Sequence, residues 1–299
     1  MSRDVLSRRG IALLITVFFI MLITLSVGAG LKYINGASKS VQSEQFMFQS
    51  AMILDDVLKL LETSKELAAV DSPDELAIFL AESSFIPFQS NGVSVVIEIS
   101  SARDRVNPNT LITKSRLDAF KNYLMLKMVN MEYADMLSDV IGGIKEDMSY
   151  NTDVFNQKPY LFRDYIASSK HLDELNDSYL KRYHENSLQN IDTDKLFHVS
   201  KDKNSSVDLN FATASAWELM LGCDENRAET LSSGGGTYAT LDDLSLSETE
   251  KISLDEFKTS FFEPYIYVKI EITQKDSTAN IAFEYDIQSK RGSNFVFEV

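Results

Sequence analysis

Uncharged residues run without interruption from Ile11 to Leu31, bounded by Arg9 and Lys32. At about 1.5 Å per residue, a helix of this length spans the ~30 Å hydrocarbon core of a bilayer. Arginines before the run predict a cytoplasmic N-terminus and an extracytoplasmic body. The pattern predicts a single membrane-spanning helix. Ordinary signal cleavage near Ala29, where small residues cluster, is the alternative.

The helical pattern continues beyond this run. Apolar residues recur there at steps of four and three, on one face of a helix: Met47, Ala51, Leu54, Leu58 and Leu61. Taken from Ile11 to about Leu67, the helix would be roughly 85 Å long. Its first half, apolar all round, suits lipid, and its amphipathic second half suits a globular body. We therefore expect a continuous stalk from membrane to body.

Apolar and polar residues alternate in three later segments, which predicts half-buried strands. The inward faces are Val93, Val95, Ile97 and Ile99; Ile266, Val268, Ile270 and Ile272; and Ile281, Phe283, Tyr285 and Ile287. Residues 274–279 between the last two segments are predicted to form a hairpin loop, and residues 294–299 a short further strand.

The middle of the chain has a helical pattern instead. From Lys114 to about Ile144 apolar residues fall on one side of a predicted helix: Leu117, Phe120, Leu124, Met128 and Met131. Residues 145–205 are polar and mixed, with short helical pieces. The order of elements predicts an α+β protein in which a helical domain, residues 114–260, is inserted into a small α/β domain formed by residues 32–113 and 261–299.

Composition narrows the function. The net charge is −15, and so acidic a chain repels nucleic-acid backbones. Cys223, the one cysteine, cannot form an intrachain disulfide, and we expect a buried, inert thiol there, with an intermolecular bond as the alternative.

The sequence carries no recognisable catalytic motif. His171, His184 and His198 lie in polar surroundings without the spacing of a metal or catalytic site, and we expect them at the surface. The acid pairs 55–56 and 242–243 are best explained as solvated faces or helix caps. We expect no enzyme activity, no cofactor and no metal; a membrane-anchored hydrolase is the alternative.

Residues 207–231, VDLNFATASAWELMLGCDENRAETL, resemble a helix-hairpin-helix unit. Asn210 and Thr213 are placed to cap the first helix, Gly222 to make the turn, and residues 227–228 to face inward. In DNA-binding members of this class, the hairpin amides meet a phosphate. Here the acids at 224–225 occupy that position, so a structural use of the unit is expected, with DNA binding as an alternative.

The N-terminal junction resembles that of type IV prepilins. A short basic leader, residues 1–10, ends in Gly10 and is followed directly by the apolar run. The resemblance implies that a prepilin peptidase cuts between Gly10 and Ile11, and that the helix stays in the product with a methylated N-terminus. Residues 11–31 would then be the transmembrane half of the stalk.

The order of the motifs over the whole chain resembles the K-type minor pseudopilins of type II secretion systems (general secretion pathway protein K). The motifs are the prepilin junction, a strand followed by Asp104, Asn107, Asn109 and Leu111, the LDEL sequence at 172–175, the helix-hairpin-helix entry and the terminal hairpin. The resemblance implies a small pilin-like antiparallel sheet with a long stalk helix and an inserted helical domain.

The family also accounts for Ile15, at the fifth position of the mature chain. Most prepilin-like proteins carry there a glutamate that neutralises the N-terminal amine of a neighbour inside the apolar bundle, and K-type members lack it. A subunit at the tip has no neighbour above it, so losing the charge removes nothing from the fibre and eases extraction from lipid.

Family members often bind calcium through an acidic stretch of the helical domain. The corresponding residues here are 139–144, where Asp139 is kept but Gly142 and Ile144 replace oxygen ligands. We expect a solvated acidic loop. A site rebuilt from Glu146, Asp147 and Asp153 is the alternative.

The resemblance implies a function and a set of partners. The chain would lie at the tip of a periplasmic pseudopilus anchored in the bacterial inner membrane, nucleate its assembly and help to export folded proteins. Its partners would be the I- and J-type minor pseudopilins, the prepilin peptidase and possible secreted substrates. The stripe from Met47 to Leu61 would pack against partner stalks. A minor pilin of a type IV pilus or competence system remains the alternative.

Overall fold

The computed structural model describes residues 39–90, 92–146, 149–183, 186–275 and 277–298. These residues divide into two compact units. The sheet unit comprises residues 39–71, 78–100 and 266–298, and the helical unit comprises residues 72–77 and 101–265. The helical unit is thus inserted into the sheet unit, with wider limits than residues 114–260.

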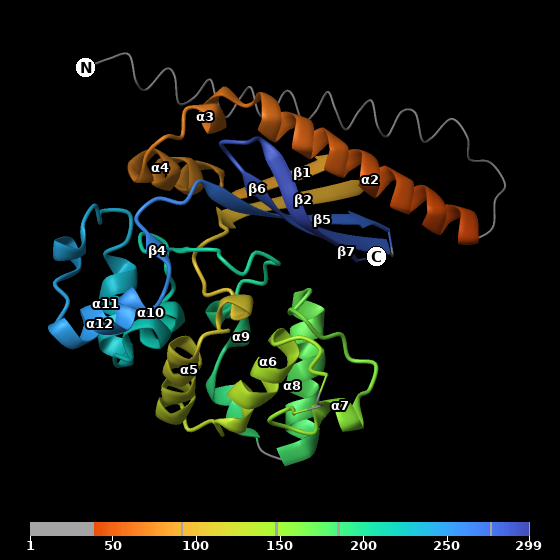
Figure 1. Cartoon of the computed structure of the whole chain (residues 1–299). Helices are drawn as coiled ribbons and strands as arrows, with labels where there is room; N and C mark the ends of the chain where they lie inside the picture. The colour runs from red at the N-terminus through yellow and green to blue at the C-terminus, as the bar shows by residue number, and fades with distance from the viewer. Residues whose placement is uncertain (1–38, 91, 147–148, 184–185, 276, 299) are drawn as a thin grey trace. The chain divides into compact units, whose positions relative to one another are not determined.

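Five strands form the main sheet of the described chain, in the order β1-β2-β5-β6-β7 (Figure 1). Their bounds are β1 Phe85–Ser90, β2 Val93–Ser101, β5 Tyr265–Gln274, β6 Ser277–Asp286 and β7 Arg291–Glu298. β1 pairs with β2, and β6 with β7, in antiparallel fashion. Two positions separate β5 from its neighbour β6, a connection short enough only for an antiparallel hairpin.

The predicted inward faces of the three strands are confirmed. All four apolar residues of each set are buried, from Val93 to Ile99 on β2, from Ile266 to Ile272 on β5, and from Ile281 to Ile287 along and just after β6. β7 confirms the further strand and begins earlier than residue 294, whereas the hairpin loop predicted at 274–279 shrinks because both strands extend into it. β1 was not predicted.

Helix α2, Lys39–Thr63, lies along one face of this sheet (Figure 1). Where the sequence pattern predicts helix as far as Leu67, α2 ends at Thr63. Ser64 then caps a separate short helix, α3 (Lys65–Ala68), by accepting from the backbone N–H of Leu67 at 3.1 Å. α4, Pro73–Ser83, follows. None of the helices in the described ranges combines the length and the hydropathy that a membrane span needs.

The helical unit contains most of the remaining elements. Its α-helices are α5 Lys114–Leu126, α6 Glu132–Ile141, α7 Val154–Gln157, α8 Ser169–Tyr183, α9 Thr193–Leu196, α10 Ala214–Leu221, α11 Glu225–Ser233 and α12 Glu248–Asp255. The short 3-10 helices are η2 Pro108–Thr110, η3 Asn186–Asn190 and η4 Leu241–Leu244. Two strands, β3 Val207–Asp208 and β4 Thr259–Ser260, pair in parallel.

The single helix predicted over 114–144 is wrong. α5 ends at Leu126, and α6 begins at Glu132 after a turn in which Met128 takes a left-handed backbone conformation. Phe120 and Leu124 are buried as expected, but Met128 and Met131 are exposed. The apolar periodicity runs through the break, so it conceals the turn.

Aromatic side chains fill the centre of the helical unit. Phe120 is fully buried, with its ring centroid 5.5 Å from that of Phe197 and 6.0 Å from that of Tyr133. Tyr133 in turn lies 5.4 Å from Tyr179 in an edge-to-face arrangement. Trp217 of α10 is buried in the same cluster. These contacts connect α5, α6, α8 and α10 in one core.

Two buried amides, Asn107 and Asn109, connect three distant segments of this unit. Asn107 Nδ2 donates to the carbonyls of Ser200 and Asp202, both at 2.8 Å. Asn109 Nδ2 donates to the carbonyls of Ile166 at 2.9 Å and Ser200 at 2.8 Å, and its Oδ1 accepts from the N–H of Ile166 at 2.6 Å. Loops that form no helix or strand thereby satisfy their backbone groups.

Replacing Asn109 by leucine should strongly destabilise the helical unit. The substitution removes the hydrogen-bond partner of the buried N–H and C=O of Ile166 and one of the bonds accepted by the Ser200 carbonyl. Each buried group that loses its partner costs roughly 1–3 kcal/mol of unfolding free energy. We expect a total loss of about 3–5 kcal/mol in unfolding free energy, measured by urea denaturation of the full chain. Asn122→Leu, at an exposed position of α5, is the matched control and should change stability by under about 0.5 kcal/mol. Equal losses in both variants would contradict the role of Asn109.

Candidate partner-binding surface on helix α2

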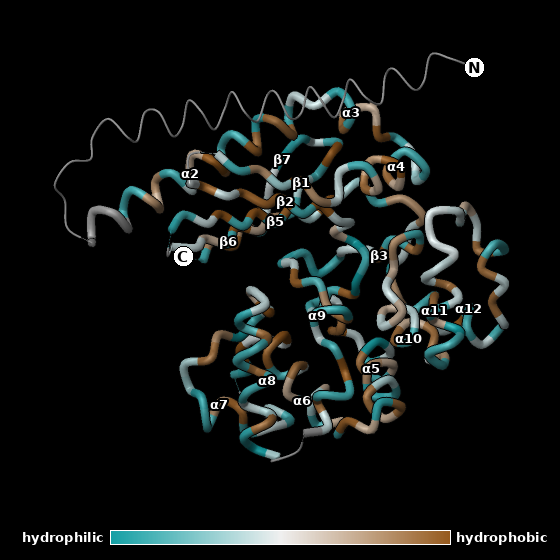
Figure 2. The backbone as a smooth tube through the Cα atoms, turned by 180° about the vertical axis from the view of Figure 1, so that it is seen from behind, coloured by the Kyte–Doolittle hydropathy of each residue, from teal (hydrophilic) through white to brown (hydrophobic). Residues whose placement is uncertain are grey.

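α2 has a buried face and an exposed face. Phe46, Ile53, Val57 and Leu61 are buried, at spacings that keep them on one side of the helix. That side meets the sheet, chiefly β6. Hydrophobic and hydrophilic colours alternate along α2 in Figure 2, as an amphipathic helix requires. The sheet therefore determines which side of α2 remains available to a partner.

The predicted stripe lies on the flank of α2 rather than wholly on either face. Met47 and Ala51 are exposed, Leu54 and Leu58 are half-buried, and Leu61 is buried in the core. Leu58 packs within its own unit: a methyl group added at Gly292 of β7 would come within 3.2 Å of its Cδ2. Only the N-terminal part of the stripe is accessible, and packing against partner stalks stays a prediction.

Phe48 extends this accessible part and was missed from the sequence. Its side chain is 68% exposed and that of Met47 47% exposed, in a stretch that also presents Ala51. The sequence carried a signal for this exposed residue, because Phe48 lies on α2 outside the apolar stripe that was predicted to be its packing face. One turn further on, the surface becomes charged: Asp55 pairs with Lys59 at 2.5 Å, and this bond raises the pKa of Lys59. Among the side chains of α2 that the structure describes, from residue 44 onward, the exposed apolar surface is thus confined to residues 47–51.

The edge strand β7 presents two more apolar side chains. Phe295 and Phe297 are 48% and 40% exposed, and the Phe295 ring stacks on Phe283 of β6 at 5.2 Å. The strand is irregular, with a register shift opposite Ala282–Glu284 and a left-handed backbone at Asn294. Such a bulge discourages pairing with a further strand. β1, at the other edge, carries Pro87, which has no N–H to donate.

The residues assigned to processing cannot be placed. Gly10, Ile11 and Ile15, with the predicted transmembrane segment 11–31, lie outside the described residues.

The helix-hairpin-helix unit forms as α10, a turn at Gly222, and α11. Thr213 caps α10 as predicted, accepting from the N–H of Ala216 at 3.2 Å, and Gly222 has a left-handed backbone. Asn210 does not cap: its side chain bonds instead to Tyr238 and Phe261, because their backbone groups are the ones left buried beside it. Ala228 is buried as predicted.

The hairpin has the wrong electrostatics for a phosphate. The N–H of Gly222 donates to Glu218 O at 2.9 Å, so this amide is already used. Asp224 caps α11 by accepting from the N–H of Arg227 at 2.9 Å, and Glu225 beside it is exposed. An anion would meet these two carboxylates first. The geometry favours the structural use of the unit.

Asp139, in the stretch aligned with the family's calcium site, is fully buried and not part of a solvated loop. Its Oδ1 accepts from Asn151 N at 2.9 Å and Nδ2 at 3.1 Å, and its Oδ2 accepts from Thr152 N at 2.7 Å and Oγ1 at 2.8 Å. Lys145 Nζ lies 3.9 Å from Oδ1 and supplies a counter-charge. A carboxylate offers about four lone-pair positions, and internal donors occupy all of them.

The candidate ligands that the structure describes do not fit calcium. Glu146 is exposed, and Asp153 is paired with Arg182 and contacts Gln157. Asp147 lies outside the described residues. Within the described ranges, no group of three His, Cys, Asp or Glu side chains is arranged to hold a metal ion.

Two of the histidines do not lie where the sequence predicts them. His171 and His198 are buried, not at the surface: the His171 ring packs edge-on against Phe162 at 5.9 Å, and the backbone N–H of His198 donates to Val106 O at 3.0 Å. His171 Nδ1 accepts from the N–H of Ala167 at 3.1 Å, and burial lowers the pKa of its imidazole. His184 lies outside the described residues. Cys223 is half-buried, and burial raises the pKa of its thiol to about 11, which keeps it protonated and unreactive at neutral pH.

Comparison with known proteins identifies the fold. No protein-family model matches the chain, and no curated protein matches its sequence. The structure is similar to one chain in the crystal structure of the GspK–GspI–GspJ complex from the type 2 secretion system of enterotoxigenic Escherichia coli. The TM-score is 0.57 at 13% sequence identity, over 86% of this chain and 97% of that chain.

This likeness establishes a shared fold across almost the whole of the solved chain. The α+β architecture inferred from the resemblance to K-type minor pseudopilins is therefore confirmed for the part of the chain that the structure describes. At 13% identity the likeness speaks for the fold and not for individual site residues.

Calcium should not stabilise this chain. A site filled at 100 times its dissociation constant would add about 2.7 kcal/mol, which for a domain of this size raises Tm by roughly 5–10 °C. We expect a change below about 1 °C when millimolar calcium is added, measured by circular dichroism with magnesium as the control cation. A calcium-specific rise of several degrees would show that Glu146, Asp147 or Asp153 forms a site after all.

Proposed function

We propose that this chain is a minor pseudopilin of the K type, which lies at the tip of the pseudopilus of a type II secretion system. In this role it is held in the bacterial inner membrane by residues 11–31, with its body in the periplasm. It packs beside the I- and J-type minor pseudopilins, nucleates the pseudopilus and helps to move folded proteins across the outer membrane. It has no enzymatic role.

The observation that carries this proposal is the extent of the structural likeness. The similarity to a chain solved within a GspK–GspI–GspJ complex includes both the sheet unit and the inserted helical unit, because it covers 86% of this chain and neither unit alone is that large. A simple pilin fold would match the sheet unit alone. The motif order in the sequence supports the same family independently.

The exposed beginning of α2 supports the proposed assembly. Met47, Phe48 and Ala51 present apolar side chains to solvent at the end of α2 that continues toward the predicted membrane segment. Isolated exposed apolar residues are common, but a helix that presents several together at such a place suits side-by-side packing with another helix. The charged Asp55–Lys59 pair marks where this contact would end.

The tip position rests on Ile15. A subunit inside the fibre needs a buried carboxylate to neutralise the amine of its neighbour, and an isoleucine cannot provide one. A subunit above which nothing is added does not need it.

Processing provides the first test. Prepilin peptidase should cut the chain between Gly10 and Ile11, so mass spectrometry of the membrane-extracted protein should find Ile11 at the N-terminus. Gly10→Val should leave the leader attached, whereas Ser7→Ala, a change in the leader away from the cut, should mature normally. An N-terminus near Gly30 would show ordinary signal cleavage instead and would exclude a pseudopilin.

Assembly provides the second test. Phe48→Glu places a charge in the proposed contact, and the loss of a central aromatic anchor typically costs about 2 kcal/mol, or about 30-fold in affinity. We expect co-purification of the full chain with the I- and J-type partners to fall by at least this factor. Leu58 is unsuitable for this test, because it supports its own unit against β7.

Ile252→Glu is the matched control, since Ile252 is 69% exposed on α12 in the other unit. It should leave the complex intact. If Phe48→Glu and Ile252→Glu co-purify equally well with the partners, α2 is not the contact. If deleting the gene abolishes piliation but not protein secretion, the chain belongs to a pilus.

A further inference from the structure

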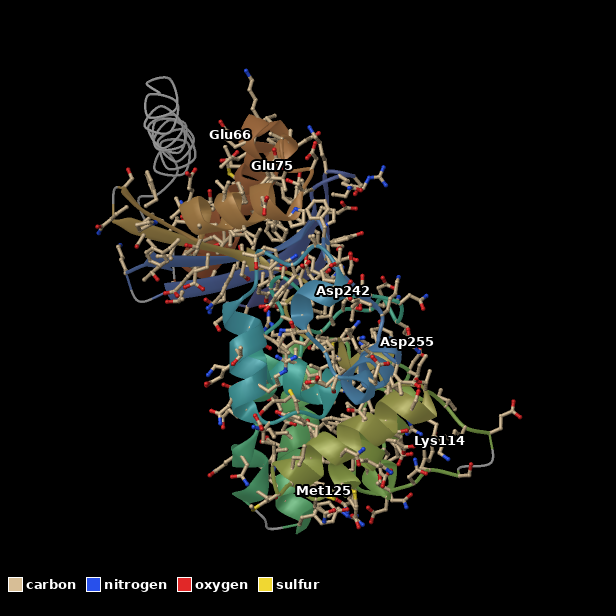
Figure 3. All side chains as sticks on the ribbon, turned by 90° about the vertical axis from the view of Figure 1, so that its left-hand side faces the viewer. Glu66, Glu75, Lys114, Met125, Asp242 and Asp255 are labelled. Atoms are coloured by element: carbon tan, nitrogen blue, oxygen red, sulfur yellow. The ribbon has the colours of Figure 1, made fainter. Side chains whose placement is uncertain are left out.

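The turn between α5 and α6 exposes a group of large apolar side chains. Met125, Leu126, Met128 and Met131 are 58%, 56%, 83% and 48% exposed, within seven consecutive residues. We call them the methionine surface. In Figure 3, Met125 lies near the C-terminal end of α5, and Lys114 marks the N-terminal end of the same helix. The proposed assembly through α2 does not use this surface.

Met128 occupies a position that normally belongs to glycine. The N–H of Val129 donates to Leu124 O at 2.8 Å, and the N–H of Met128 donates to Met125 O at 3.0 Å. These two bonds define the helix ending in which the residue after the cap is left-handed, and Met128 has φ of 56°. A side chain with a Cβ is disfavoured there, and Gly or Asn is usual.

Hydrogen bonds and one buried side chain determine the course of this turn. Asn190 Nδ2 donates to Lys127 O at 2.9 Å, and the N–H of Glu132 donates to Asn130 Oδ1 at 3.0 Å. Val129 is buried, which anchors the middle of the turn. The backbone therefore holds Met128 outward in a fixed place. The backbone of Met128 is strained and its side chain is exposed, so neither contributes to the stability of the unit. Residues with such unfavourable backbone angles are frequent at binding sites.

Two lysines beside the surface are neutralised internally, whereas Glu132, next to Met131, is an exposed carboxylate that accepts a hydrogen bond from the hydroxyl of Tyr183. Lys127 pairs with Glu218 at 2.7 Å, and Lys121 pairs with Asp135 at 2.6 Å. The surface consequently offers a binding partner apolar contact beside one exposed negative charge. The chain as a whole carries −15, so a second copy and an anionic lipid surface are both repelled. Unbranched methionine side chains adapt to differently shaped apolar groups.

From these observations we infer that the methionine surface binds an exposed apolar segment of another protein, one that is neutral or basic and rich in aliphatic or aromatic side chains. Binding through Met128 and its neighbours would be adaptable rather than specific for one sequence.

Substituting Met128 by glycine separates a binding role from a structural one. Glycine relieves the left-handed strain, so Met128→Gly should raise the Tm of the helical unit by about 2–4 °C. The same change removes the most exposed side chain of the surface. The probe is a fluorescently labelled amphipathic peptide of leucine and lysine, added to the purified full chain. Anisotropy is measured at high salt, which screens general attraction to the acidic body.

We expect Met128→Gly and Leu126→Ser each to weaken peptide binding about tenfold or more, and Ile252→Ser, at an exposed apolar position elsewhere, to bind as the unaltered chain does. Unchanged binding in both surface variants would overturn the proposal. So would a fall in Tm for Met128→Gly, which would show that the side chain stabilises its own unit. Preferential binding of phosphatidylglycerol vesicles, or self-association in sedimentation that Met128→Gly removes, would assign the surface to a different occupant.

Discussion

The helical unit depends on the hydrogen bonds of two buried amides, Asn107 and Asn109. Long stretches of this unit, around residues 160–168 and 198–206, form neither helix nor strand, so their backbone groups have no regular partners. The two side chains supply those partners from a single short segment. The bonds made by the side-chain amide of Asn109 and by Nδ2 of Asn107 measure 2.6 to 3.0 Å. The aromatic core around Phe120 can then close over the loops. The same constraint keeps the helical unit compact, although in the sequence it is an insertion between β2 and β5.

The sequence predicts well those parts of the fold in which one face is buried. Strands β2 and β5 alternate in burial, because one side chain in two meets the core, and β6 does so except at Glu284, which is also buried. The sequence predicts the fold less well where the apolar spacing of one helix happens to continue into the next, as it does from α5 to α6. Leu124, Met128 and Met131 continue a helical stripe through a turn that no glycine marks. β1 escapes notice because Pro87 breaks the pattern of a strand, although an edge strand tolerates it.

Side-chain partners were the least predictable feature of the candidate sites. Asn210 lies where a helix cap is expected, but its side-chain amide donates instead to the backbone carbonyls of Tyr238 and Phe261. Asp139 is expected in a solvated acidic loop, yet it lies in α6 and is buried, because Asn151 and Thr152, twelve and thirteen residues away, supply its donors. On α2 the periodicity correctly predicts an amphipathic helix, but which of its residues are buried depends on how the helix packs on the sheet. Phe48 is exposed for that reason, and Leu61 is buried.

Helix α2 is thus assigned two roles: its buried face packs on the sheet of its own unit, and its exposed apolar residues at 47–51 are proposed to contact the partner pseudopilins. Site-specific photo-cross-linking in the native host tests this division most directly. A photoreactive residue at Phe48 should form adducts with the I-type pseudopilin, whereas the same residue at Lys59, on the charged part of α2, should not. Equal adducts from both positions, or adducts from neither while secretion continues, would contradict the account.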